Sequence, residues 1–185
     1  MIAIFVYVGA EVAIGSFLIN YIADPRIGDI DAGAAARYVS YYWGGAMIGR
    51  FVGSALLQTL DARRLLGLFA LVAITLLATT MSSGGALAMW SVIAIGLFNS
   101  IMFPTIFTLA IRDLGPLTGR ASSLLVMAIV GGAVVPLLQG LLADRIGVQH
   151  AFVLPLLCYG YVAWYGFRGS RSHVALAAPV PAGQP

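Results

Sequence analysis

Long apolar runs separated by short polar connections limit most strongly what this sequence can fold into. The chain has 185 residues, of which 61% are hydrophobic and only 9% are charged. The interior of a soluble domain is too small to hide that much apolar surface, whereas a lipid bilayer solvates it. The sequence therefore predicts an all-α membrane protein.

Six segments are long enough to cross a bilayer, because a membrane-spanning helix needs about 20 mostly apolar residues. They are residues 1–23, 37–60, 65–81, 86–111, 120–142 and 150–167. Most connections between them are short, so neighbouring helices are expected to be antiparallel. Residues 169–185 are rich in Ala, Pro and Gly, and we expect them to form a disordered cytoplasmic tail.

Arginines indicate the orientation of the chain, since cytoplasmic connections of membrane proteins carry an excess of basic residues. The connections of one set, together with the tail, contain Arg63, Arg64, Arg112, Arg120, Arg168 and Arg171. In the other set, aspartates dilute the arginines. The first set is predicted to be cytoplasmic, which places both termini inside the cell.

Leu-Leu-Gln runs occur in both the second and the fifth segment. Residues 56–58 lead toward Asp61, and residues 137–139 lead toward Asp144. The two runs fall at corresponding positions of two three-helix units and on opposite sides of the membrane. This is the pattern of an inverted repeat, and two such repeats form one half of a major-facilitator fold.

Two charged residues, Glu11 and Arg50, lie inside apolar segments. A charge at bilayer depth costs about 2.5–3.5 kcal/mol, so it usually faces a protein interior or a water-filled path. For Glu11 two interpretations stay open: a structural carboxylate bonded to a neighbouring helix, or a contact for substrate or protons. For Arg50, near the predicted cytoplasmic end of its segment, we favour a structural role, either snorkelling to the interface or pairing with a carboxylate.

The second segment carries a glycine stripe and an aromatic group. Gly45, Gly49 and Gly53 recur every four residues, and small residues at this spacing let another helix backbone approach closely. We interpret the stripe as a packing surface. The aromatic group consists of Tyr38, Tyr41, Tyr42 and Trp43. It fits an aromatic belt at headgroup level, and the alternative is a platform on which a sugar ring stacks.

The fourth segment places Asn99, Phe103 and Pro104 at mid-membrane depth. Pro104 lacks an amide donor and is expected to kink the helix, while Asn99 and Phe103 share one face. An amide, an aromatic ring and a kink suit a binding site for a polyol. The alternative is an amide that hydrogen-bonds a neighbouring helix.

Several separated motifs occur in an order that one transporter family shares. Residues 103–107 read Phe-Pro-Thr-Ile-Phe, and residues 111–115 read Ile-Arg-Asp-Leu-Gly. Supporting motifs lie at residues 7–12, 15–17, 49–53, 122–123 and 131–132. Together they resemble the fucose/galactose/glucose:proton symporter family of the major facilitator superfamily, over nearly the whole chain to about Arg168.

The resemblance implies that residues 1–168 are the seventh to twelfth helices of a twelve-helix sugar permease. Such a permease takes up a monosaccharide with protons by alternating access, in the bacterial cytoplasmic (inner) membrane. The partner of this chain would be the N-terminal six-helix half. In relatives the aromatic residue before the proline is often tyrosine, so Phe103 keeps ring stacking but loses a hydroxyl. In such permeases the carboxylates credited with proton coupling lie in the first six-helix half. The resemblance therefore does not imply that Glu11 carries protons.

The expected roles fall into two groups. Sugar contacts are expected from Glu11, Asn99 and Phe103, with Tyr42 and Gln139 as weaker candidates. Structural or gating roles are expected for Gly45, Gly49, Arg50, Gly53, Asp61 and Pro104.

Other functional classes fit the sequence less well. An intramembrane enzyme needs a base or metal ligands at mid-depth, and neither histidine, His150 or His173, lies there. We expect no cofactor, no metal and no nucleic-acid partner. The apolar run begins at Ile2 with no basic residue before it, unlike a signal peptide, and we read it as the start of a fragment. The alternative function is a non-transporting membrane subunit or an inactive fragment.

Overall fold

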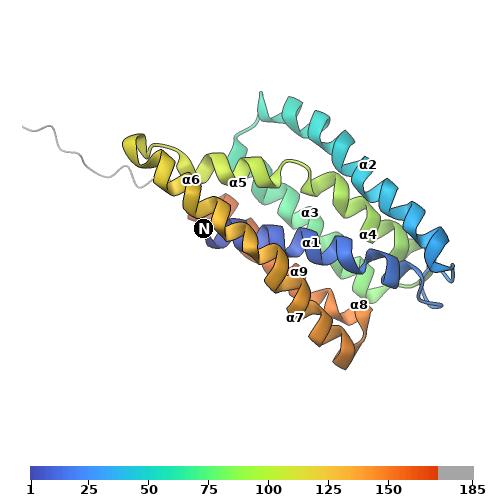
Figure 1. Cartoon of the computed structure of the whole chain (residues 1–185). Coiled ribbons are helices and arrows are strands. Elements are labelled where there is room, and N and C mark those ends of the chain that lie inside the picture. The colour runs from blue at the N-terminus through green and yellow to red at the C-terminus, as the bar shows by residue number, and fades with distance from the viewer. Residues whose placement is uncertain (171–185) are drawn as a thin grey trace, which may run out of the picture.

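The computed structural model describes residues 1–170, which form helices joined by short connections (Figure 1). Two short 3₁₀ turns are named η1 and η2, and a final π-helical turn is named η3. In chain order the elements are α1 (Ile2–Ile22), α2 (Ala32–Leu57), α3 (Ala62–Ser82), α4 (Gly85–Asn99), α5 (Met102–Ile111), η1 (Gly115–Leu117), α6 (Thr118–Met127), η2 (Ala128–Val130), α7 (Gly131–Ile146), α8 (Val148–Ala151), α9 (Val153–Trp164) and η3 (Tyr165–Gly169). The predicted tail, residues 169–185, lies outside the described residues apart from Gly169 and Ser170.

Aspartate caps place two helix starts earlier than the apolar pattern predicted. The Asp31 carboxylate accepts hydrogen bonds of 2.8 and 3.0 Å from two amides of the first turn, so α2 begins at Ala32 and not at Arg37. Asp61 caps α3 in the same way, and that helix begins directly after it. Such side chains satisfy amides that a first helical turn leaves without partners.

Three of the six predicted segments are divided into more than one element. The fourth is split into α4 and α5 at Ser100 and Ile101. The fifth runs from Gly115 to Ile146 as η1, α6, η2 and α7. The sixth consists of α8, α9 and η3. The hydropathy pattern did not reveal these divisions, because apolar side chains continue through them.

By length and composition, four stretches of the described residues can cross a membrane. They are Ile2–Ile22, Ala62–Ser82, Gly85–Ile111 and Gly115–Ile146. The other two predicted spans are not among these four stretches, for different reasons. Helix α2 is long enough but carries two arginines and many small or polar residues, whereas α8 and α9 are separate pieces of 4 and 12 residues.

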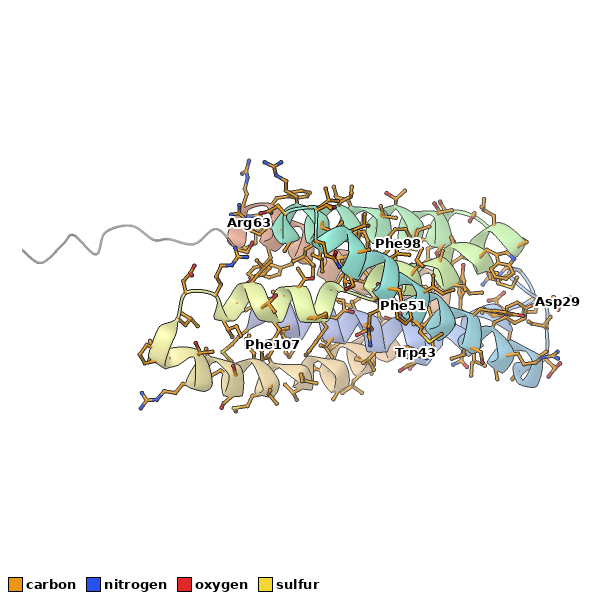
Figure 2. All side chains as sticks on the ribbon, turned by 90° about the horizontal axis from the view of Figure 1, so that it is seen from above. Asp29, Trp43, Phe51, Arg63, Phe98 and Phe107 are labelled. Atoms are coloured by element: carbon orange, nitrogen blue, oxygen red, sulfur yellow. The ribbon has the colours of Figure 1, made fainter. Side chains whose placement is uncertain are left out.

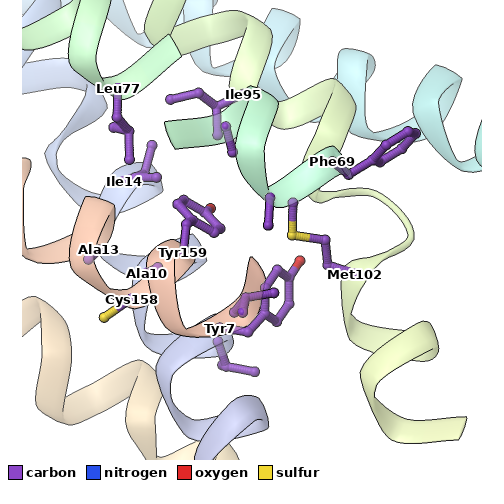
Figure 3. Close-up of a cluster of buried hydrophobic side chains, with 14 of the residues drawn as sticks. Tyr7, Ala10, Ala13, Ile14, Phe69, Leu77, Ile95, Met102, Cys158 and Tyr159 are labelled. Carbon is purple, nitrogen blue, oxygen red and sulfur yellow. The ribbon is translucent and has the colours of Figure 1, made fainter. Parts of the chain in front are cut away.

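Helix α1 lies at the centre of the bundle (Figure 1). It packs mainly against α7 and α9, while α4 packs mainly against α2 and α3, and α3 also packs against α9. The buried core includes Tyr7 and Tyr159, which lie among apolar side chains in Figure 3. Asp29 and Arg63 lie at opposite ends of the bundle in Figure 2.

Glycines bring helix backbones into contact in two of these pairs. A Cβ atom on Gly49 of α2 would overlap the Leu97 carbonyl of α4, and one on Gly131 of α7 would overlap the Phe5 carbonyl of α1. Of the other stripe glycines, Gly45 also faces α4, and Gly53 faces Ile101 at the α4–α5 break. The stripe therefore lies where tight packing requires it, against the fourth predicted segment.

The two Leu-Leu-Gln runs do not occupy equivalent places in the structure. Gln58 is the exposed C-cap of α2, whereas Gln139 lies within α7 and is buried. The expectation that both runs mark helix exits is wrong, because α7 continues to Ile146.

Candidate functional site

A cavity of about 520 Å³ opens on the face shared by α1, α2 and the α4–α5 break. Its lining residues are Tyr7, Glu11, Trp43, Arg50, Ser100, Phe103 and Pro104. A second cavity of about 360 Å³ shares Glu11, Trp43 and Arg50 with the first and extends over α2 to Phe51. Figure 2 shows Trp43 and Phe51 along α2. The two cavities form one polar and aromatic surface, which we call the cavity face.

Glu11 and Arg50 supply opposite charges to the cavity face. Glu11 is half-buried, and its carboxylate interacts with the Tyr7 hydroxyl and with the charge of Arg50. Both side chains are described by the structure, and no direct ion pair joins them. Both residues line the two cavities, so a ligand in the cavity would lie beside both charges.

The Arg50 side chain contacts the α4–α5 break instead of snorkelling to the membrane surface. Its Nε donates a hydrogen bond of 3.4 Å to the Ser100 carbonyl. In an unbroken helix that carbonyl would accept the amide of the residue four positions later, which is Pro104. Because proline has no N–H, the carbonyl is left for another donor.

The Asn99 carbonyl at the same break accepts a hydrogen bond of 2.8 Å from the Tyr7 hydroxyl. Tyr7 belongs to α1 and Arg50 to α2. The carbonyls of Asn99 and Ser100 are thus bonded by side chains from two other helices, and both of these side chains line the cavity face. These two hydrogen bonds stabilise the break between α4 and α5.

The Asn99 side chain turns away from the cavity face and into the core. Its Nδ2 donates to the Tyr42 hydroxyl at 2.8 Å, and its Oδ1 accepts from the Tyr159 hydroxyl at 2.7 Å. Asn99 is only 1% exposed, and both tyrosines are fully buried. This arrangement matches the helix-packing interpretation of Asn99, and it places Tyr42 behind the cavity wall.

Gln139 is also absent from the lining of the cavity face. Its side chain is 0% exposed, and neither amide atom has a hydrogen-bond partner among the described residues. It lies on α7, one turn after Val135, which packs against Gly9 of α1. The structure thus places it in the α1–α7 interface.

Asp61 lies outside the membrane-spanning helices, at the start of α3. Backbone N–H groups of Arg64 and Arg63 donate to its carboxylate at 3.1 and 3.0 Å, and the Arg63 Nε lies 3.5 Å away. These interactions, led by the bond from Arg64, lower the pKa of Asp61 below its ordinary value. The structure shows Asp61 as a helix cap.

Of the predicted site residues, the structure brings together Glu11, Arg50, Phe103 and Pro104. The sequence predicts Trp43 only as a member of the aromatic group, whereas the structure places it at the cavity face. It is 51% exposed and lines both cavities. The sequence does indicate Trp43, because positions 43 and 50 are two helical turns apart and share a face.

Several known proteins with similar sequences are bacterial sugar transporters. The chain is 56% identical over 171 residues to a glucose/galactose transporter of Brucella abortus, covering 92% of this chain and 42% of the relative. It is 45% identical over 175 residues to a putative glucose/galactose transporter of Helicobacter pylori, with the same coverage. It is 35% identical over 176 residues to the L-fucose-proton symporter of Escherichia coli, covering 95% of this chain and 40% of that protein. No protein-family model matches the chain.

A solved structure has the same arrangement of helices. The crystal structure of FucP, a major facilitator superfamily transporter, in the outward conformation matches with a TM-score of 0.88 and 34% sequence identity. The match covers 92% of this chain and 41% of that chain. The chain thus spans less than half the length of the relatives it matches, and these relatives are transporters and not enzymes. It is a segment of a multi-pass membrane protein that belongs to the fucose/glucose/galactose:proton symporter family of the major facilitator superfamily.

Proposed function

We propose that this chain forms the C-terminal six-helix half of a proton-coupled monosaccharide transporter of the bacterial inner membrane. The observation that carries the proposal is the cavity face, where a carboxylate and a guanidinium lie beside two aromatic rings. The first of its two cavities has a volume of about 520 Å³, which is within the usual range for small-molecule sites. The names of the relatives support a hexose or fucose-type sugar as the substrate.

The cavity face offers the groups that a neutral polyol needs. The Glu11 carboxylate can accept hydrogen bonds from sugar hydroxyls, and the Arg50 guanidinium can donate to them. Phe103 and Trp43 present ring faces on which the apolar C–H side of a pyranose can stack. Asn99 and Tyr42 then act indirectly, because they are bonded in the core behind this wall.

Alternating access requires a second wall opposite the cavity face. We propose that an N-terminal six-helix half supplies it, and that all six segments of this chain cross the membrane with both termini in the cytoplasm. Helix α1 of the first three segments packs on α7 of the last three, and α4 of the last three packs on α2 of the first three. This reciprocal packing supports an arrangement of two inverted three-helix repeats. Rocking of the two halves would expose the cavity face to each side in turn.

Transport into vesicles tests the proposal. Vesicles that carry the protein with both halves should accumulate radiolabelled hexose in a saturable way, and a protonophore should abolish the accumulation. We expect vesicles with residues 1–185 alone to show none. Complete activity of residues 1–185 alone would contradict the two-wall arrangement. Failure of the two-half protein to bind any hexose or fucose would contradict the proposed function and favour a non-transporting subunit.

A further inference from the structure

At the α4–α5 break a backbone carbonyl lacks its helical amide partner, and this break lies beside the cavity face. Pro104 is the third residue of α5, so the helix lacks one amide in its first turn. The Ser100 carbonyl, which that amide would have bonded, accepts the Arg50 Nε instead. Since Phe103 is the residue directly before Pro104, the conformation of this turn sets where its ring lies in the cavity.

The packing of α2 fixes Arg50 beside the break. Gly49 directly precedes Arg50, and a Cβ atom there would overlap the Leu97 carbonyl and approach the Ser100 hydroxyl. This close approach brings the start of the Arg50 side chain to the last turn of α4. Arg50 also lines both cavities, and its guanidinium has further N–H donors besides Nε.

We infer that Arg50 is a positioning residue that replaces the amide missing at Pro104 and thereby couples the shape of the α4–α5 break to occupancy of the cavity face. A ligand oxygen that draws the guanidinium into the cavity weakens its bond to the Ser100 carbonyl and loosens the break. Loss of the bond in turn moves Phe103. The ligand part of this inference rests on the proposed function, whereas the coupling between Arg50 and Pro104 does not.

Hydrogen exchange at the break tests the coupling without any sugar. The protein is purified with both halves, and exchange is followed by mass spectrometry in peptides that cover residues 98–107. Arg50→Gln should accelerate exchange at the break about tenfold, the effect expected for losing one hydrogen bond to a charged donor. Arg37→Gln, which changes an exposed arginine of the same helix, serves as the matched control and should leave the exchange unchanged.

A double-mutant cycle distinguishes positioning from general damage. Pro104→Ala supplies an N–H that can bond the Ser100 carbonyl, so Arg50→Gln should have little further effect on exchange in that background. Additive effects of the two substitutions would overturn the inference, as would unchanged exchange in Arg50→Gln alone. If Arg50→Gln does not fold, Arg50→Lys keeps the charge but alters the donor geometry, and it should give a smaller acceleration that Pro104→Ala again removes; additive effects in that pair would overturn the inference equally.

Sugar binding, measured on the same samples, separates the two proposals. Saturating hexose should accelerate exchange at residues 98–107 in the wild type but not in Arg50→Gln. Hexose binding with no change in wild-type exchange would overturn the ligand part of the inference. If no sugar binds any variant while the Arg50–Pro104 coupling is present, the proposed function fails and the positioning role stands.

Discussion

The Tyr7 hydroxyl donates a hydrogen bond of 2.8 Å to the backbone carbonyl of Asn99, and this bond links the central helix to the end of α4. Through the Asn99 side chain the link continues to Tyr42 on α2 and Tyr159 on α9. One asparagine therefore connects four helices at the depth of the cavity face. The sequence favours a sugar contact for Asn99 with helix packing as the alternative, and the structure places its amide in the packing network.

Asn99→Ala should destabilise the protein more than it changes sugar affinity. The substitution leaves the Tyr42 and Tyr159 hydroxyls without their buried partner, and each unsatisfied buried group costs about 1–3 kcal/mol. A clear drop in melting temperature is expected in detergent, with the dissociation constant for hexose nearly unchanged in the folded fraction. Asn20→Ala, at an exposed position of α1, is the control and should melt like the wild type. A large loss of affinity without loss of stability would instead support direct sugar contact by Asn99.

Glu11→Gln should weaken sugar binding because an amide accepts fewer hydrogen bonds than a carboxylate and donates where the ligand also donates. We expect the dissociation constant for the transported sugar to rise about tenfold, as for loss of one charge-assisted hydrogen bond. Isothermal titration of the two-half protein measures it. Unchanged affinity and unchanged transport would remove Glu11 from the site.

Trp43 should report on ligand binding through its fluorescence. Its indole lines both cavities, whereas Trp90 packs against Tyr38 and Tyr41. Sugar should change the emission of the wild type, and Trp43→Phe should remove that change while keeping a ring for stacking. Trp90→Phe is the matched control and should retain the response. A response that survives Trp43→Phe and disappears in Trp90→Phe would contradict the assignment of the site.

Gly49→Ala should separate α2 from α4, since the added methyl group would overlap the Leu97 carbonyl. Overpacking of this kind costs about 1–3 kcal/mol. Gly44→Ala is a close control, because no atom lies within 4 Å of the added group and alanine is the better helix former. Thermal melts should show destabilisation by the first substitution and none by the second. Equal melting temperatures would contradict the close contact.

Gln139→Leu should stabilise the protein or leave its stability unchanged. The glutamine amide is buried without a partner among the described residues, and an apolar side chain of similar size removes that desolvation cost. Gln58→Leu, at the exposed end of α2, controls for the general effect of the substitution. Loss of sugar binding in Gln139→Leu would contradict this account and support the weaker sequence-based role for Gln139.

How far the sequence predicts this molecule depends on which force dominates at each position. Membrane insertion is governed by apolar length, so hydropathy alone locates the most apolar long helices, such as α1 and α3. The early start of α2 depends on two capping hydrogen bonds to Asp31, which an apolar pattern does not record. The separation of Asn99 from Phe103 depends on the break at Ser100, because a continuous helix would have kept both on one face.

The α2–α4 contact and the α7–α1 contact differ in which residues lie one helical turn away from the contacting glycine. A shift of α2 by about 5.4 Å along its axis would bring Gly45 or Gly53 to the place that Gly49 holds against α4. The same shift of α7 would bring Val135 onto the Phe5 backbone, because Gly131 is the first residue of α7 and Val135 lies one turn after it. A shift by one turn would therefore keep a glycine at the α2–α4 contact but place a β-branched side chain at the α7–α1 contact. Between α2 and α4 the register is set by polar bonds, from Arg50 to the Ser100 carbonyl and from Asn99 to the Tyr42 hydroxyl, and not by glycine spacing alone.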